Sequence, residues 1–389
     1  MKKLLIIISI GLVVIGCKKK ESDPVPDNTT KTTTTAELSS PLFETQYGDA
    51  YDYVDIGENP ITILSSNDII VSSIHYDGTI DKLQISKINA TGGLLWQKTF
   101  SQGYQYKSGK CFETATGDLI VIGATIAPSN WTYSKVYIAK LNAATGDTIW
   151  TRSYGYNYID GGIVGYEDSG SNYWIVDFNN QDNKATLLKI GSNGDSLTSV
   201  LDAPQSHYKD AMVTANKEIV IVGESGTSIS SKQPIYISKY TNGNQNFNSS
   251  IILNNYDNVQ VKDVCQTADG NFVVVGTCFN FSSTSLRYGF LIKTDASGNK
   301  IWEKVLTQFN GSEITSCVEK QADVFYLGVG GYNSGNLYKY DLTNLTVIDN
   351  QYRQPDAQLL IKNGTLHRGI IEANASFYQT VKLKVYSIN

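Results

Sequence analysis

The residues best suited to chemistry are acids that recur along the chain, each at or near the start of a β-rich segment. Two carboxyl groups roughly 5 to 9.5 Å apart in an open cleft could act as the acid and base of a glycoside-cleaving enzyme. A position that repeats more often serves the repeat, here by accepting hydrogen bonds from backbone N–H groups. We expect that structural role first, with an acid-lined rim for sugars, peptides or cations as the alternative. The acids are Asp52, Asp160, Asp210, Asp263, Glu313 and Asp356.

A second set of candidates consists of aromatic and basic residues in long, turn-rich connections. These residues occupy no repeated position, unlike the large aromatics that recur once per repeat. Singular, exposed aromatics and arginines on loops are typical contacts with a binding partner. We predict partner contacts at Trp131, Tyr133, Phe281, Arg287 and Tyr288.

Other common chemical motifs are missing from the sequence. His75, His207 and His367 lie in different repeats and lack the short spacing of a metal site. The sequence has no EF-hand-like loop and no Gly-x-Ser-x-Gly elbow. We therefore assign no catalytic residue, no metal and no cofactor, and we expect a binding protein in preference to an enzyme while leaving catalysis open.

The elements that must position these residues form a repeat of about 50 residues, within the range of a propeller blade. Each repeat has a hairpin, a Gly- or Asn-containing turn and a short strand with a large aromatic, as in Asn142 to Trp150. In the second repeat we predict strands at 110–114, 119–123, 136–141 and 147–154. Equivalent points on the fourth strand are Trp96, Trp150, Thr198, Phe247, Trp302 and about Val347.

The two ends of the repeat array complement each other. Residues 42–48 resemble a fourth strand with no strands before it, whereas residues 356–386 supply three strands and then stop. We predict that the stretch around Phe43 pairs with the final strand near Tyr386, because closing a ring removes open sheet edges. The expected fold is all-β, a seven-bladed β-propeller of four-stranded antiparallel blades; six or eight blades also fit the pattern.

One family resemblance follows from these repeats. The spacing of Asn142, Thr145, Gly146 and Trp150 resembles that of quinoprotein-like β-propellers, and residues 291–302 look like repeats of exported Bacteroidota propellers. The resemblance implies a propeller over most of residues 42–389, with the tryptophans packed between blades. It implies no activity, because the chain lacks the adjacent cysteine pair and second domain of a quinone-dependent dehydrogenase.

The N-terminal residues predict a lipoprotein. A charged start and an apolar run from Leu4 to Ile15 precede Gly16-Cys17, and the last four residues of this segment resemble a bacterial lipobox. We predict a signal peptide over 1–17 and lipidation of Cys17, whose acyl chains would hold the protein to a membrane. Residues 18–40 are rich in Lys, Thr and Pro and predict a disordered tether. The propeller domain is expected over 41–389.

Four cysteines lie beyond the predicted lipobox. An even number in an exported protein permits disulfides, but the spacing fits no small disulfide scaffold. We expect Cys265 and Cys317 at matching positions of their repeats, and we predict buried free thiols with disulfides as the open alternative. The four are Cys111, Cys265, Cys278 and Cys317.

The net charge narrows the choice of partners. At −5, the chain has no electrostatic reason to bind nucleic acid. We predict an outer-membrane lipoprotein, with exposure at the cell surface suggested by the charged tract after Cys17. Its partner is predicted to be an envelope protein or a glycan, bound without catalysis. The alternative is a carbohydrate-active enzyme or glycan-capture protein that uses the rim acids. The sequence does not indicate an oligomeric state.

Overall fold

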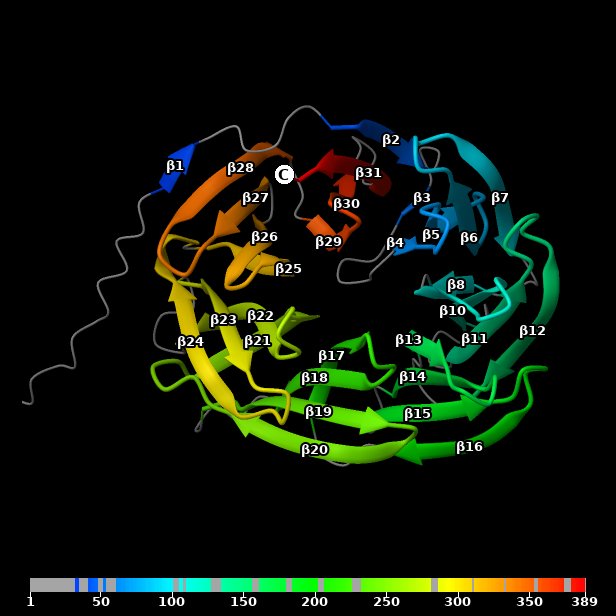
Figure 1. Ribbon diagram of the computed structural model, residues 1–389, viewed down its shortest axis with the longest axis horizontal. Coiled ribbons are helices and arrows are strands. Elements are labelled where there is room, and N and C mark those ends of the chain that lie inside the picture. The colour runs from blue at the N-terminus through cyan, green and yellow to red at the C-terminus, as the bar shows by residue number, and fades with distance from the viewer. Residues whose placement is uncertain are drawn as a thin grey trace, which may run out of the picture.

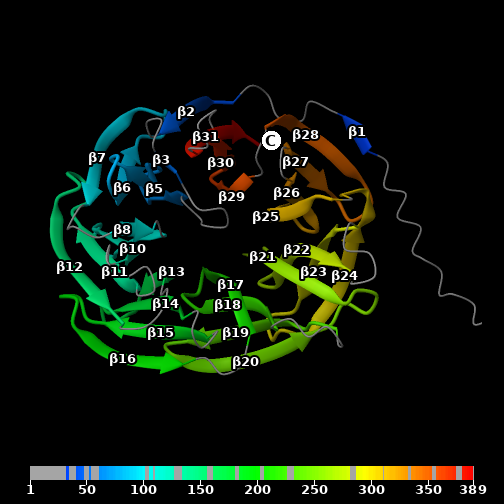
Figure 2. The same ribbon diagram turned by 180° about the vertical axis from the view of Figure 1, so that it is seen from behind.

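A computed structural model shows seven β-sheets arranged in a ring around a central axis (Figure 1). The view from behind shows the same closed ring (Figure 2). The structure describes residues 32–34, 41–47, 52–53, 61–100, 105–107, 110–126, 134–155, 161–179, 184–201, 206–225, 232–280, 286–309, 311–331, 334–352, 356–373 and 379–388.

Each blade consists of antiparallel strands. The blades are numbered in chain order, and in blades 1 to 6 the chain runs from the innermost strand to the outermost one. In blades 1 and 2 the innermost strand is divided into two short pieces. Blade 1 contains β3 (Asp52–Tyr53), β4 (Ile61–Ile63), β5 (Ile69–Tyr76), β6 (Asp81–Ile88) and β7 (Leu94–Phe100). Blade 2 contains β8 (Gln105–Lys107), β9 (Cys111–Glu113), β10 (Leu119–Ile126), β11 (Ser134–Leu141) and β12 (Thr148–Tyr154).

The other blades have undivided inner strands. Blade 3 contains β13 (Gly161–Glu167), β14 (Tyr173–Asn179), β15 (Lys184–Ile190) and β16 (Ser196–Leu201). Blade 4 contains β17 (Ser206–Val213), β18 (Ile219–Ser225), β19 (Ile235–Thr241) and β20 (Asn244–Ile251). Blade 5 contains β21 (Asn258–Gln266), β22 (Phe272–Phe279), β23 (Tyr288–Thr294) and β24 (Lys300–Leu306). Blade 6 contains β25 (Glu313–Gln321), β26 (Val324–Gly331), β27 (Ser334–Tyr340) and β28 (Leu345–Tyr352).

Blade 7 combines the two ends of the propeller. It contains β29 (Asp356–Lys362), β30 (Thr365–Ala373), β31 (Gln379–Ser387) and, as its outermost strand, β2 (Phe43–Tyr47). Phe43 pairs with Val385 in antiparallel register, and the N–H of Leu42 donates a 2.7 Å hydrogen bond to the Val385 carbonyl. The predicted seven-bladed ring closed by the N-terminal strand is therefore confirmed.

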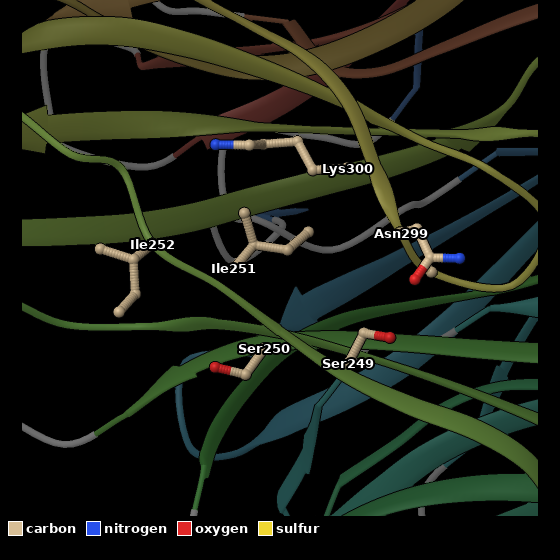
Figure 3. Close-up of a pocket in the computed structure, with 7 residues that line it drawn as sticks. Ser249, Ser250, Ile251, Ile252, Asn299 and Lys300 are labelled. Atoms are coloured by element: carbon tan, nitrogen blue, oxygen red, sulfur yellow. The ribbon is translucent and has the colours of Figure 1, made fainter.

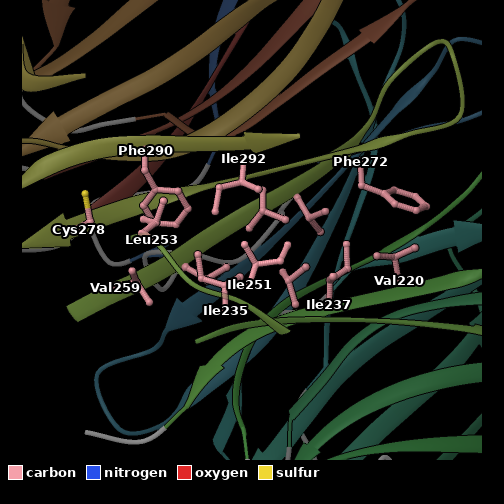
Figure 4. Close-up of a cluster of buried hydrophobic side chains, with 14 residues drawn as sticks. Val220, Ile235, Ile237, Ile251, Leu253, Val259, Phe272, Cys278, Phe290 and Ile292 are labelled. Carbon is pink, nitrogen blue, oxygen red and sulfur yellow. The ribbon is translucent and has the colours of Figure 1, made fainter. Parts of the chain in front are cut away.

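The core is divided among the interfaces between blades. Seven clusters of buried apolar side chains lie at the seven interfaces. Figure 4 shows the cluster between blades 4 and 5, where Ile237 and Val220 face Phe290 and Ile292. All eight residues of β22 are buried, because neighbouring blades cover both faces of this strand. This explains why the second strands have continuous apolar sequences.

Aromatic residues on the outermost strands pack against glycines of the next blade. A Cβ atom on Gly146 would lie 2.8 Å from the ring of Trp96, and the Trp96 Nε1–H donates a 3.1 Å hydrogen bond to the Ala143 carbonyl. The ring of Phe43 lies equally close to Gly92. These contacts place the aromatics between blades, at equivalent register points. In blade 6 this register point on the outermost strand is occupied by Thr346, one residue before the predicted Val347. Thr346 pairs with Lys339 in the same way as Trp96 pairs with Lys87.

One short strand lies outside the blades. β1 (Thr32–Thr34) pairs in parallel with the outer edge of β28, with Thr32 beside Leu345. It falls within the segment for which the sequence predicts a tether. Among the described residues, none forms a helix long and apolar enough to cross a membrane.

Candidate functional site

β-Bulges shape the start of several innermost strands. Strand pairing shifts by one residue around Lys209 in β17, around Lys262 in β21 and around Thr315 in β25. Each bulge adds one residue and so redirects the side chains next to it. We call the residue that directly follows the bulge, and the residue at the same register in other blades, the post-bulge position. In five blades it is occupied by Lys110, Asp210, Asp263, Ser316 and Gln358.

Acids at the post-bulge position connect neighbouring blades. Oδ2 of Asp210 accepts a 3.3 Å hydrogen bond from the N–H of Val264, and Oδ2 of Asp263 accepts one of 2.8 Å from the N–H of Cys317. A buried N–H without a partner destabilises the fold by about 1 to 3 kcal/mol, so these bonds stabilise the inner strands. Asp210 and Asp263 thus join blades 4, 5 and 6.

A lysine from the far side of blade 3 completes this buried network. Nζ of Lys110 lies 3.2 Å from Oδ1 of Asp210 and donates a 2.8 Å hydrogen bond to the Ala211 carbonyl. Burial and then the neighbouring Asp210 carboxylate raise the pKa of Asp263 well above its usual 3.8. All four oxygens of the two carboxyl groups accept hydrogen bonds. Both carboxyl groups are therefore already engaged in hydrogen bonds within the protein.

A second set of bonds between blades lies at the other end of the innermost strands, and the sequence analysis missed it. Oε2 of Glu319 accepts a 2.6 Å hydrogen bond from the N–H of Ala268, and Oε2 of Glu113 accepts one of 2.7 Å from Ser65. The regular spacing of these acceptors could have revealed them. The acceptors are Glu113, Glu167, Gln266 and Glu319.

One group of partly exposed charges lies where the innermost strands begin, on a surface that we call the loop face. Nζ of Lys209 lies 3.2 Å from Glu224, and Glu313 lies 2.9 Å from Lys262 and 3.0 Å from Arg287. We call these five residues the cationic cluster. The three basic side chains are 31 to 41% exposed, whereas the two acids are only 9 and 23% exposed. The basic groups of the cluster are therefore more exposed to solvent than its acids.

Aromatic rings support the cationic cluster. The guanidinium of Arg287 lies 5.3 Å from the centre of the Phe279 ring, at cation–π distance. Tyr288 contacts Tyr256 edge to face, with ring centres 6.0 Å apart. The second acid, Glu224, is fixed by the N–H of Val261, which donates a 2.7 Å hydrogen bond to Oε2. Burial raises the pKa of Glu224 despite the nearby Lys209.

This arrangement suits the binding of an anion. A planar guanidinium and two ammonium groups can take a carboxylate or another anionic oxygen group. The present ion pairs are partly exposed, and such pairs contribute only about 0 to 1 kcal/mol each. An incoming anion could therefore replace Glu313 at Arg287 with little loss.

The predicted site residues fall into three groups. Arg287, Tyr288 and Glu313 lie on the loop face, and Asp210 and Asp263 form the buried pair. For Asp52 in β3 and Asp356 in β29, the structure describes the strand pairing and not the side chains. The predicted residues outside the described parts of the chain are Cys17, Trp131, Tyr133, Asp160 and Phe281.

A shallow groove lies elsewhere, at the outer edge between blades 4 and 5 (Figure 3). It has a volume of about 300 Å³ and lies between the end of β20 and the turn before β24. Its lining includes Ser249, Ile252 and Asn299, and its one charged side chain, Lys300, is paired with Glu303 at 2.6 Å. The side chains that line this groove do not form a set suited to catalysis.

A cluster of metal-binding side chains is likewise absent from the part of the chain that the structure describes. No three His, Cys, Asp or Glu side chains there lie close enough together to hold a metal ion. His367 is buried beside Thr365, with 2.8 Å between its Nε2 and the threonine Oγ1, and burial lowers its pKa to about 4. It is therefore neutral at physiological pH and belongs to the core.

Comparisons with known proteins reveal the fold alone. No family model matches the sequence, and no curated protein matches it. A polysaccharide lyase, Uly1, is similar at a TM-score of 0.56 and 10% identity, over 88% of this chain and 92% of the lyase. YCF48 bound to a D1 peptide has a TM-score of 0.56 at 9% identity, over 94% and 100% of the two chains. A streptogramin B lyase has a TM-score of 0.51 at 12% identity, over 88% and 97%. The chain shares the seven-bladed β-propeller fold with enzymes and with a peptide-bound protein.

Proposed function

We propose that the protein is a non-enzymatic binding or scaffold propeller, held at the outer membrane by lipid on Cys17 and exposed at the cell surface. Its cationic cluster would bind an anionic group of an envelope protein or a glycan. This interpretation combines the N-terminal lipobox pattern with the charges on the loop face.

One observation carries the proposal. The described acids near the axis already serve the fold, since Asp210 and Asp263 accept bonds from the next blade. In the cationic cluster on the same side, the more exposed groups are the basic ones, Lys209, Lys262 and Arg287. An arrangement of this kind binds anions, and it leaves no carboxyl group of the pair available as a general acid or base.

The fold of similar structures agrees with a binding role without selecting it. A propeller with a bound D1 peptide and a lyase acting on a polysaccharide have comparable TM-scores. Both a peptide and a polysaccharide can carry carboxylates. The partner class is therefore proposed from the charges of this chain and not from its fold.

The binding proposal is tested with paired probes. Full-length protein is titrated with a uronic-acid oligosaccharide and its neutral counterpart, and with an acidic peptide and its amidated counterpart. We expect one acidic probe to bind and the K262Q/R287Q double variant to weaken it by about tenfold or more, since a bond to a charged group contributes about 1.5 to 3 kcal/mol. Lys98, which pairs with Asp147 at 3.0 Å, provides the matched control K98Q. Equal binding by the double variant and the wild type would refute the cluster as the site.

The anchor is tested separately. A Cys17→Ala variant should lose fatty-acid labelling and leave the membrane fraction, while the wild type remains in the outer membrane and is reached by protease on whole cells. Membrane retention without Cys17 would contradict the lipid anchor.

The carbohydrate-active alternative requires Asp263, whose pKa is raised by burial and by Asp210, to act as an acid in spite of the hydrogen bonds that the pair accepts. In that case Asp263→Asn should abolish cleavage of a glycan while the folded protein keeps its stability. If neither the wild type nor the folded variant cleaves the glycans that the wild type binds, this alternative is refuted.

A further inference from the structure

Two cysteine thiols meet at the interface between blades 5 and 6. Cys265 lies on β21 and Cys317 on β25, the innermost strands of the two blades. The Sγ atoms are 3.1 Å apart, and the Cys317 thiol donates to Cys265. They were expected at matching positions of the repeat, but the register places Cys317 opposite Leu327 and Cys265 opposite Val273. The equivalent of Cys317 in blade 5 is Val264, and this offset by one residue lets the two thiols approach each other.

The other described cysteines are elsewhere. Cys111 is buried in the cluster between blades 1 and 2. Cys278 is buried in the cluster between blades 4 and 5, where its Sγ lies 3.6 Å from the Tyr288 carbonyl. Within the described residues, one pair of thiols is thus in contact and two thiols are separate.

We propose that the mature protein carries a disulfide bond between Cys265 and Cys317 that joins blade 5 to blade 6. Its formation rests on the proposed export, because disulfides persist in oxidising compartments. The sulfurs, now 3.1 Å apart, would have to approach by about 1 Å to reach a bonding distance of about 2.05 Å.

The bond forms by thiol–disulfide exchange with a disulfide-containing oxidant. The thiolate of one cysteine attacks a sulfur of the oxidant, which makes a mixed disulfide and releases the first oxidant thiol. The thiolate of the other cysteine then attacks the first, so the Cys265–Cys317 bond forms and the second oxidant thiol leaves. The two cysteines are oxidised, the oxidant is reduced, and the two protons end on the released thiols.

Burial determines when this exchange takes place. Cys317 is 2% exposed, and burial followed by the neighbouring Cys265 thiol raises its pKa well above 9.0. The reactive thiolate is therefore scarce once the ring is closed. The exchange belongs to folding, while blade 6 is docking on blade 5 and an oxidant still has access. Afterwards the same burial protects the bond from reduction.

Differential alkylation of the full-length exported protein tests the bond directly. The protein is denatured in the presence of one alkylating reagent, which labels the free thiols. It is then reduced and treated with a second reagent, and mass spectrometry locates both labels. Cys111 and Cys278 should carry the first label, and Cys265 and Cys317 the second. The first label on Cys265 or Cys317 would overturn the proposal, and so would a bond from either one to Cys278.

Because the bond is protected in the folded state, the second readout compares thermal unfolding of the oxidised protein with that of protein reduced while denatured and then refolded in reductant. A cross-link closing a loop of 52 residues restricts the unfolded chain, so reduction should lower the wild-type Tm by about 5 °C or more. The C265A/C317A variant should have the same Tm in both conditions, whatever its own stability. The control C278A should respond to reductant as the wild type does. A wild-type Tm that does not respond would count against the bond.

Fractionation separates this failure from failure of the proposed export. Free thiols in a protein recovered outside the cytoplasm refute the disulfide alone. Where the protein stays in the cytoplasm, refolding it with oxidised glutathione still tests the pair, because Cys265 and Cys317 should then oxidise before the other two cysteines.

Discussion

Oε1 of Gln358 in blade 7 accepts a 2.7 Å hydrogen bond from the N–H of Ile61 in blade 1, 297 residues earlier in the chain. Asp210 and Asp263 make the same contact to the next blade in the middle of the ring. The junction that closes the propeller is thus held at the post-bulge position as well as by the pairing of β2 with β31. A neutral amide performs here the role that carboxylates perform elsewhere.

Replacing Gln358 by Leu should therefore weaken the junction. The substitution leaves the buried N–H of Ile61 without an acceptor, and we expect the free energy of unfolding to fall by about 1 to 3 kcal/mol. Urea unfolding measures this change. The exposed Gln97 on β7 offers the matched control Q97L, which should change stability by less than about 0.5 kcal/mol. Equal effects of the two variants would show that the Gln358 contact contributes nothing.

The stability of the protein should depend on pH through Asp263. Its folded pKa is raised above 3.8, so the native state holds this proton more tightly than the unfolded chain does. The resulting stabilisation is full below pH 3.8 and is lost as the pH rises through the folded pKa. Asp263→Asn keeps a neutral acceptor for Cys317, so it should remove this part of the pH dependence in urea unfolding from pH 4 to 8.

Asp269 provides a comparison of opposite sign. A hydrogen bond from Thr267 lowers its pKa to about 2, so its contribution is present above pH 3.8 and is lost as the pH falls toward 2. Because this side chain is about half exposed, the change caused by Asp269→Asn should be small. An unaltered pH profile in the Asp263 variant would contradict the role given to the buried pair.

Two glycines with similar backbone angles separate strain from packing. Gly146 has a φ of +74° and Gly117 one of +80°, but only a Cβ on Gly146 would collide with Trp96, whereas Gly117 faces open space. Gly117→Ala should show the backbone penalty of about 1 to 2 kcal/mol alone. Gly146→Ala should add about 1 to 3 kcal/mol of overpacking, measured as a further loss of Tm. Equal losses would mean that Trp96 gives way without cost.

A buried arginine occupies a place that other blades fill with aliphatic residues. Arg368 pairs with Leu359 as Val274 pairs with Val264, and its guanidinium lies 2.7 Å from Asp349 in blade 6. Removing it leaves a partly buried carboxylate without this partner, so Arg368→Met should lower stability by about 3 to 5 kcal/mol. The double variant R368M/D349N should recover part of that loss in chemical unfolding. If the second substitution deepens the loss, the ion pair is not the cause.

The sequence predicts the ring better than it predicts the site. Phe43 could be recognised as a displaced fourth strand because large aromatics recur at one register point, and the pairing of Phe43 with Val385 agrees. The acids were grouped as one set, yet Glu313 lies at the equivalent of Gln260 and not of Asp263, because both strands bulge at the same point and Glu313 lies three residues before Ser316. Bulges leave little trace in a single sequence, because the extra residue can be of any type. The partners of Arg287 and Glu313 likewise come from different segments, and only the fold brings them together.

The pairing of β2 with β31 also sets an order of assembly. β2 leaves the ribosome before any blade, but its partner strand β31 follows all the other strands of the ring in the chain. Throughout elongation the molecule is an open arc whose two terminal edges are uncovered, and contacts across such a long sequence separation form slowly. A polypeptide interrupted before β31 would keep both edges available for pairing with other chains. Chaperone demand should therefore last until β31 has been synthesised.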